Sequence, residues 1–291
     1  MTNLLVIGAT GNIGQPLIRD LQDDPDVHLF AGVHNSEHAK QALNGLKVQV
    51  RRFDFLDPAT FEQALADIDK VFFVRPPQLA KPKEDMYPFL DALVARHVKQ
   101  VVFVSLLGVA HNPMTPHHQI EKRIVELGLP YTFIRPSFFM QNLNTTHQAD
   151  IVGHRDLFVP AGHARTSFID TRDIGATAAV VLRDPAYIGQ KLDITGAQAL
   201  TYADAAQIMT MELGVPITYS KPSFWRFRKV MLQRGLPKNY VNVMVMLYLI
   251  TQLGNAKTVT TTLPNVLGRP AISFEQYVHD YRAEFLPKPL S

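Results

Sequence analysis

The residues near the N-terminus have the types and spacing of a nucleotide-binding turn. An apolar run of strand length, residues 4–7, leads into three glycines spaced three residues apart, Gly8, Gly11 and Gly14. The first glycine would permit a tight turn, the second would let the backbone approach a pyrophosphate, and the third would let the next helix pack against the strand. Phosphate groups bind the unpaired N–H groups at such a helix N-terminus. The segment therefore predicts a dinucleotide site; the alternative is a turn that uses glycine for packing alone.

The elements that would position this turn are strand-like runs that alternate with helical patterns. Six strand-like runs follow the first one, at residues 27–33, 48–53, 70–74, 100–104, 131–135 and 191–195. Helical patterns between them include residues 61–66, 87–96 and 120–127. Alternation of this kind is typical of a parallel sheet with helices on both faces. We predict an α/β fold: a Rossmann-type doubly wound parallel sheet with a smaller, interleaved C-terminal substrate lobe.

The alternation breaks down after about Ser137, where proline, aromatic and methionine residues become frequent. Two helical runs there, residues 202–213 and 224–234, have no strand between them. We predict that residues 1–136 form the NAD(P)-binding domain and that residues 166–196 return to it. Residues 137–165 and 197–291 would form the substrate-side lobe.

Composition excludes several classes of function. The chain has 291 residues, 46% of them hydrophobic, which is enough for a full core. Its net charge of +3 is too small to imply a polyanion partner, and the absence of cysteine excludes disulfides, thiolate metal sites and cysteine nucleophiles. No signal-peptide pattern is present, and the longest uncharged stretch, residues 240–256, is shorter than the ~20 residues of a membrane span. We expect a cytoplasmic protein.

A basic run later in the chain has two interpretations. Arg226, Arg228, Lys229, Arg234 and Lys238 are interspersed with apolar residues. The run could be a nucleic-acid or partner surface, but a solvated helix face is the favoured interpretation. Because no DNA-reading motif is present, we expect neither a nucleic-acid nor a membrane partner.

The end of the second predicted strand bears on the choice of cofactor. An acidic residue there would bind the ribose hydroxyls of NAD, but the turn reads His34-Asn35-Ser36 and contains no carboxylate. These side chains could donate hydrogen bonds to a 2′-phosphate, although no arginine is present to grip it. NADP(H) is therefore preferred and NAD(H) remains possible. His34 and His38 lack a third ligand, so we expect no metal site.

The next two strand ends offer further contacts. Asp54 could accept a hydrogen bond from the adenine amino group, whereas Asp57, next to Pro58, is typical of a helix N-cap. Arg75, in the turn at residues 74–77, could reach either phosphate or solvent, and the sequence leaves this choice open.

Five segments resemble the NmrA-like branch of the atypical short-chain dehydrogenase/reductase superfamily, and they occur in order over residues 1 to about 200. They are Gly-Ala-Thr-Gly-Asn-Ile-Gly at 8–14, Val-Arg-Pro-Pro at 74–77, Val-Ser-Leu-Leu-Gly at 104–108, Ile-Arg-Pro-Ser-Phe-Phe-Met-Gln-Asn at 134–142 and Phe-Ile-Asp-Thr-Arg-Asp-Ile-Gly at 168–175. The tail around residues 267–274 is also similar. The resemblance implies either an NAD(P)H-dependent reductase of quinones and other small electrophiles or a redox-sensing regulator of another protein.

The resemblance also implies catalytic residues, with one departure. Such dehydrogenases use a serine after the fifth strand, matched by Ser105, and a Tyr-x-x-x-Lys on the next helix, where Lys122 fits the lysine that binds the nicotinamide ribose. His118 occupies the tyrosine position. The Tyr-x-x-x-Lys string at 187–191 lies before the seventh strand, on the wrong element. The helix itself is well marked, with Thr115 as N-cap and Pro116 at its first position.

Each of these three residues has an alternative role. An imidazole with a pKa near ~6.5 could donate a proton at neutral pH, but His118 could equally be an exposed polar residue. Lys122 could be a solvated residue paired with Glu121 or Glu126. The Ser105 hydroxyl could simply satisfy the backbone at the strand end.

A substrate pocket over the nicotinamide would come from the C-terminal lobe. Aromatic and methionine side chains suit a flat apolar substrate, and ordinary core packing is the alternative. The expected pocket residues are Phe139, Met140, Asn142, Phe168 and Trp225. Asp170 and Asp173 would cap a helix that starts at Ile174.

The complete prediction ranks a reductase of a small apolar quinone or carbonyl first and a non-catalytic NAD(P)H redox sensor second. The partner would be a small-molecule substrate or a regulated protein, and a homodimer is left open. The expected catalytic residues are Lys122, His118 and Ser105. The expected cofactor contacts are Gly8, Thr10, Gly11, Asn12, Ile13, Gly14, His34, Asn35, Asp54, Phe55, Val74, Arg75, Pro76, Ser105, Lys122, Pro136 and Phe138.

Overall fold

The protein divides into two compact units in this computed structural model, which describes residues 1–287. Unit 1 consists of residues 1–136, 171–194 and 265–268, and unit 2 contains the remaining residues. The segment that returns to unit 1 thus spans 171–194, compared with the predicted 166–196.

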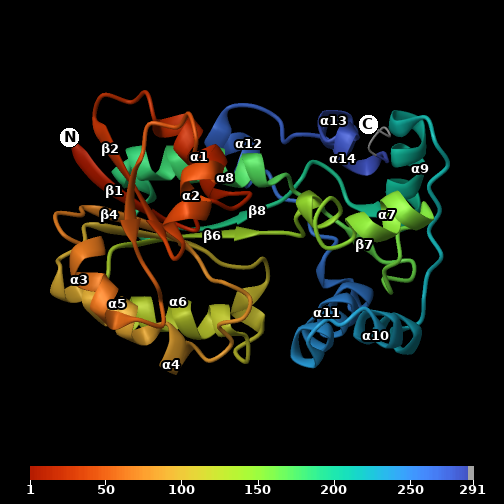
Figure 1. The fold of residues 1–291 in the computed structure, drawn as a ribbon, viewed down its shortest axis with the longest axis horizontal. Helices are drawn as coiled ribbons and strands as arrows, with labels where there is room; N and C mark the ends of the chain where they lie inside the picture. Colours follow the sequence, from red (N-terminus) through yellow and green to blue (C-terminus); the bar gives the residue numbers. More distant parts are fainter. Residues whose placement is uncertain (288–291) are drawn as a thin grey trace. The chain divides into compact units, whose positions relative to one another are not determined.

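Unit 1 is built on a seven-stranded, fully parallel sheet (Figure 1). Its strand order is β3-β2-β1-β4-β5-β6-β8. The strands are β1 Thr2–Ile7, β2 Val27–Val33, β3 Gln49–Arg52, β4 Lys70–Val74, β5 Gln100–Val104, β6 Tyr131–Pro136 and β8 Lys191–Ile194. All seven predicted strands are present, so the predicted Rossmann-type fold is confirmed. The strand order reverses between β1 and β4, and in such sheets ligands bind beyond the carboxyl ends of the strands at that point.

Helices cover both faces of this sheet (Figure 1). On one face lie α1 Gly14–Leu21, α2 Ser36–Ala42 and α8 Thr171–Arg183. On the other lie α3 Phe61–Ala64, α5 Tyr87–Ala95 and α6 Pro116–Glu126, with α4 Pro82–Asp85 next to α5. A close approach joins α1 to α8, because a Cβ on Gly175 would lie 2.8 Å from the Pro16 Cβ. Only glycine fits at that contact.

The core on the α5–α6 face is rich in phenylalanine. Phe73 and Phe103, on neighbouring central strands, stack with ring centroids 4.6 Å apart. Phe89 of α5 packs edge-on against Phe73 at 5.5 Å. Stacked and edge-on arrangements are both favourable for aromatic rings. The rings hold α5 against the strands that end near the expected cofactor site.

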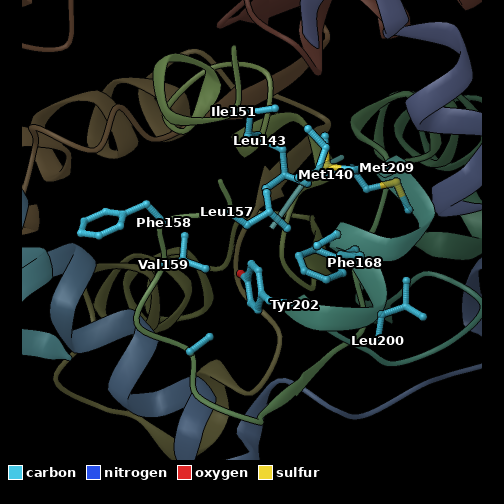
Figure 2. Packing of buried hydrophobic residues seen from close by; sticks show 14 of the residues in the cluster. Met140, Leu143, Ile151, Leu157, Phe158, Val159, Phe168, Leu200, Tyr202 and Met209 are labelled. Atoms are coloured by element: carbon cyan, nitrogen blue, oxygen red, sulfur yellow. The ribbon is translucent and has the colours of Figure 1, made fainter. Parts of the chain in front are cut away.

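Unit 2 is mainly helical and has its own core. Its elements are α7 Gln148–His154, β7 Arg165–Thr166, β9 Leu200–Thr201, α9 Tyr202–Leu213, α10 Phe224–Gln233, α11 Lys238–Ile250, α13 Phe274–Asp280 and α14 Arg282–Phe285; α12 Thr262–Leu267 lies where the chain passes between the units. Helix α9 starts at Tyr202, as the sequence predicts, because Thr201 and Asp204 form a reciprocal capping box. Figure 2 shows Tyr202 against Phe168 in this core, with ring centroids 5.2 Å apart.

The long uncharged stretch at 240–256 forms most of α11 and a continuing turn, Thr251–Asn255, that ends the helix at Gly254. Gly254 has a φ of 88°, a left-handed conformation that glycine adopts without strain. Within residues 1–287, no helix is long and apolar enough to cross a membrane.

Candidate functional site

The glycine turn between β1 and α1 has the geometry of a phosphate cradle. The Gly11 N–H donates to the Gly8 carbonyl at 3.0 Å, and Gly8 adopts a φ of 87°. A Cβ on Gly14 would lie 2.3 Å from the Gly8 carbonyl oxygen, so Gly14 allows α1 to start against the strand. A Cβ on Gly11 would meet only that carbonyl oxygen, at 3.3 Å. The space in front of Gly11 is therefore open.

The N-terminus of α1 has no capping side chain. Its N-cap position is Ile13, which offers no side-chain hydrogen bond, and no acidic residue lies in its first turn. The first N–H groups of a helix have no partner within the helix, and its dipole favours negative charge there. The open space at Gly11 and the uncapped helix end together fit a pyrophosphate.

We predict that Gly14→Ala destabilises the protein by about 1–3 kcal/mol, because its Cβ overlaps backbone atoms that cannot move independently. Gly153→Ala is the matched control, since Gly153 lies in α7 with nothing within 4 Å of its Cβ. It should be neutral or slightly stabilising. Urea denaturation compares the two variants, and equal stability would contradict the close packing at Gly14.

The end of β2 differs from the sequence-based argument in one respect. The turn has no carboxylate of its own, but Asp54, from the end of β3, places its Oδ2 3.0 Å from the Nδ1 of His34. A carboxylate from the neighbouring strand end therefore lies beside His34, a contact that the sequence did not predict. His34 is 79% exposed, and its Nε2 remains available to a ligand. The carboxamide oxygen of Asn35 caps α2 by accepting from the Glu37 and His38 N–H groups, which leaves its NH₂ group as the donor.

The two aspartates after β3, Asp54 and Asp57, have different roles. Asp57 accepts from the Ala59 N–H and caps a short helix at Pro58, as the sequence predicts. Asp54 accepts from the Leu56 N–H at 2.9 Å, so this carboxylate is held in place. Phe55, between the two, is buried in the core.

Arg75 braces the loop after β4. Its NH1 donates to the carbonyl oxygens of Pro76 at 2.9 Å and Leu79 at 2.7 Å. Burial lowers the pKa of Arg75, although a guanidinium remains charged at neutral pH. The side chain therefore stabilises the loop at Pro76, an arrangement that differs from both contacts the sequence left open.

Helix α6 brings His118 and Lys122 together on one side. The two residues border a groove of about 310 Å³ whose wall includes Phe133, Arg135 and Lys191. The Lys122 Nζ lies 3.7 Å from the Glu126 carboxylate and its side chain is 67% exposed. The His118 Nδ1 lies 3.1 Å from the Val109 carbonyl oxygen. This groove lies towards β6 and β8, the two strands beyond β5 in the sheet.

A different histidine, His117, faces the centre of the sheet. Its ring stacks on Phe103 of β5 with centroids 5.8 Å apart. Burial and the neighbouring Arg75 cation lower the pKa of His117 to about 3, so its imidazole is neutral. Sequence reasoning missed this role. The signal was available, because His117 has helical spacing with the buried residues Ile120, Glu121 and Ile124.

Ser105 follows β5 and is buried, at 1% exposure. Its N–H donates to the Ile134 carbonyl at 2.7 Å, but its hydroxyl has no partner among the described residues. A buried hydroxyl without a partner is costly, and a bound ligand could satisfy it. Phe103 and Ser105 are two residues apart along the chain, a spacing that in an extended strand places side chains on the same face. Ser105 and His117 thus belong to the same region of unit 1.

Pairs of charges hold α6 and its neighbours in place. Glu121 of α6 binds the Arg135 guanidinium of β6 through two hydrogen bonds, and both side chains are buried. This pair joins the helix that carries His117 to the strand that ends at Pro136. Among the described residues, no group of three or more His, Asp or Glu side chains is placed to hold a metal ion.

The residues expected to line a substrate pocket have different environments in unit 2. Met140 and Phe168 are 2% exposed and belong to the core, whereas Trp225 is 81% exposed. Phe138 is partly buried and its ring lies 6.0 Å from that of Tyr248. Phe139 and Asn142 are half-buried at the start and end of a short 3-10 turn. Asp170 accepts from the Gln141 amide, and α8 begins at Thr171 rather than at Ile174, with Asp173 in its first turn.

Buried polar pairs in unit 2 have no signal in the sequence. The His147 Nε2 lies 2.6 Å from the Tyr248 hydroxyl, and burial lowers the pKa of His147 to about 4. The Arg234 guanidinium binds the buried Asp150 carboxylate through two hydrogen bonds. The partners are separated by 101 and 84 residues, so only the folded chain brings them together.

The sheet order, the glycine cradle and the uncapped α1 define a Rossmann-type dinucleotide-binding protein. The model of the NmrA-like family matches residues 1–268, so the chain belongs to this family. A curated relative, the NAD(P)H azoreductase of Xenophilus azovorans, is 31% identical over 97% of this chain and 99% of its own length.

Two solved structures share the fold over nearly the whole chain. An NADPH-dependent quinone oxidoreductase from Escherichia coli, complexed with NADPH, has a TM-score of 0.84 and 23% identity, covering 95% of this chain and 99% of its own. NmrA, a negative transcriptional regulator in complex with NADP, has a TM-score of 0.77 and 15% identity, covering 97% of this chain and 95% of its own. At these identities the likeness shows the fold.

Proposed function

We propose that this protein is an NAD(P)H-dependent reductase of a small apolar electrophile such as a quinone, an azo compound or a carbonyl. The observation that carries the proposal is the similarity to the NAD(P)H azoreductase, at 31% identity over almost the full length of both chains. The open glycine cradle, in the position that a dinucleotide pyrophosphate requires, supports it.

NADP(H) is the preferred cofactor in this proposal. Solved structures of the same fold hold NADPH or NADP. In this chain, the Asn35 NH₂ group could donate to a 2′-phosphate. Asp54 fixes the His34 ring through Nδ1, so the His34 Nε2 could donate to the phosphate only as an imidazolium. The Asp54 carboxylate also weakens the preference for a 2′-phosphate, so NAD(H) should still bind.

The reaction would be a hydride transfer, which the reduced nicotinamide supplies when it is bound. The chain's own residues bind and orient. Gly11 and the α1 N-terminus receive the phosphates, and Ser105 offers a buried hydroxyl near the β5 end. His117 is neutral and can donate one hydrogen bond and accept another. A proton can come from water, as quinone reduction allows.

The assignment of Lys122 and His118 as catalytic residues competes with an assignment to His117. The groove that holds Lys122 and His118 lies towards β8. His117 lies over β5, one strand away from the β1–β4 reversal where a Rossmann ligand binds. The position over β5 favours His117. Ser105 remains a candidate in both assignments.

The test is a turnover screen that follows NADPH absorbance with quinones, azo dyes and aldehydes. We expect turnover with at least one flat apolar electrophile. His117→Leu should lower kcat/KM about fivefold, the ~1 kcal/mol of one neutral hydrogen bond, whereas Lys122→Ala should stay within about twofold. Lys47→Ala, an exposed ion-paired lysine far along the chain, is the matched control for Lys122. A large loss with Lys122→Ala alone would restore the lysine assignment.

A non-catalytic NAD(P)H sensor is the second candidate. It is favoured by the absence of tyrosine from α6, which removes the usual proton donor, and by the Lys122–Glu126 ion pair, which engages the lysine expected at the nicotinamide ribose. A sensor would show tight NADPH binding, no turnover with any electrophile, and NADPH-dependent hydrogen-exchange protection of residues beyond Ser137. That combination would replace the reductase proposal.

A further inference from the structure

A long segment of the chain, most of it in unit 2, has no acidic residues. Between Glu212 and Glu275 the chain has no aspartate or glutamate, whereas it has eight basic residues: Lys221, Arg226, Arg228, Lys229, Arg234, Lys238, Lys257 and Arg269. Arg234 is paired with Asp150. A one-sided charge distribution of this kind creates a positive surface potential that attracts anionic partners.

Helix α11, within this segment, is apolar on all sides from Val243 to Ile250, whereas Lys238, Asn239 and Asn242 lie in its first turns. Its inner face, with Val241, Met244 and Tyr248, is buried in the unit 2 core. The opposite face carries Val243, Met246 and Leu249, which are 45%, 46% and 47% exposed. Leu253, in the turn that follows, is 71% exposed and continues this outer face. A helix that is apolar all round is normally buried. The outer face of α11 is exposed instead, so no other element of residues 1–287 packs over it.

Helix α10 packs beside α11 (Figure 1) and adds an aromatic and basic outer face. Trp225 is 81% exposed on it. Arg228 joins the two helices, since its Nε donates to the Asn242 Oδ1 of α11 at 3.1 Å. A shallow depression of about 520 Å³ on α10 is bordered by Trp225, Arg228, Lys229, Leu232 and Gln233.

We propose that the outer faces of α10 and α11 bind the surface of an anionic lipid bilayer. We call this region the basic-apolar surface; it comprises Trp225, Arg228, Lys229, Lys238, Val243, Met246, Leu249 and Leu253. Helices that lie in a membrane interface combine lysine and arginine with exposed tryptophan and aliphatic side chains, and each basic residue is attracted to anionic headgroups. The proposal does not depend on the reductase activity, although a lipid-soluble electrophile would be concentrated at such a surface.

The aliphatic side chains distinguish a bilayer from other anionic partners. Nucleic acid would use the basic residues and Trp225, but it offers nothing to Val243, Leu249 and Leu253. From the sequence alone, a solvated helix face is the favoured interpretation of the basic run. The structure adds that the outer face of the neighbouring apolar helix is exposed.

Trp225 is the only tryptophan in the chain and therefore reports directly on this surface. Mixing the full-length protein with phosphatidylglycerol vesicles should shift its fluorescence to shorter wavelength, and brominated lipids should quench it. Phosphatidylcholine vesicles should produce neither effect. Co-sedimentation with the anionic vesicles should weaken strongly at 0.5 M salt, because the attraction is screened.

Variants that keep Trp225 locate the binding surface. Lys229→Glu with Lys238→Glu should weaken vesicle partitioning by at least about tenfold, given two reversed charges. Leu253→Ser should reduce the fluorescence shift. The matched controls are Lys40→Glu with Lys83→Glu, two exposed lysines elsewhere in the chain, and Met211→Ser, an exposed apolar residue outside the surface. Equal partitioning of test and control variants would overturn the proposal.

Two other outcomes would also overturn it. Binding to DNA or heparin without any response to anionic vesicles would identify the surface as a polyanion site. A fluorescence shift with a soluble quinone but none with vesicles would show that the apolar face receives a small molecule.

Discussion

Gly11→Val is expected to abolish NADPH binding while the protein stays folded. A Cβ at residue 11 meets only the Gly8 carbonyl oxygen, at 3.3 Å, so the turn can accommodate a side chain with a small adjustment. The valine methyl groups would then occupy the open space where the pyrophosphate must approach the backbone. We expect an affinity loss of a hundredfold or more, about 3 kcal/mol, measured by calorimetry.

Circular dichroism and urea denaturation show whether Gly11→Val is folded. Gly11→Ala should give a smaller loss of affinity, because its single methyl group fills less of the space. Gly14→Ala provides the contrast, since its defect is in stability. A folded Gly11→Val protein with wild-type NADPH affinity would refute the nucleotide site.

The second large effect is acid destabilisation through His147. Burial lowers the pKa of His147 to about 4 in the folded state, whereas a histidine of the unfolded chain titrates near ~6.5. Below pH 6.5 the unfolded chain therefore binds a proton that the folded protein does not. The stabilisation is complete above pH 6.5, falls as the pH drops, and is lost by about pH 4, a change of about 3 kcal/mol.

His147→Gln isolates this contribution from those of the carboxyl groups. Glutamine can still hydrogen-bond the Tyr248 hydroxyl but has no proton to gain, so its free energy of unfolding should fall by about 2–3 kcal/mol less than that of the wild type between pH 7 and pH 4.5. The control is His154→Gln, an exposed residue of the same helix. If the wild type and His147→Gln lose stability in parallel, His147 is not the group responsible.

The sequence by itself determined the individual strands and the phosphate turn, because both depend on neighbouring residues. Strands β2, β4 and β5 have the predicted bounds residue for residue, since each is a short apolar run flanked by polar or turn-forming residues. Helices α6 and α9 start as predicted because Thr115 and Thr201 cap them. The glycine spacing is a local pattern. Gly14 must be glycine because a Cβ there would overlap the backbone of Gly8 in the same turn.

Tertiary structure decided which element the inward-facing histidine of α6 contacts. His117 and His118 differ by about 100° around α6, and the helical spacing of His117 with Ile120 and Ile124 already indicates the inward side, but not its neighbour there. The contact with Phe103 of a different element places His117 inward, and Lys122 then falls on the outer groove.

Contacts between distant residues were also decided by the fold. Asp54 reaches His34 because parallel strands β2 and β3 end side by side, and His147 meets Tyr248 across 101 residues of chain. The exposed outer face of α11 was also decided by the fold. An apolar sequence indicates only that a helix tends to be buried, and the elements packed around the helix determine which of its faces is buried.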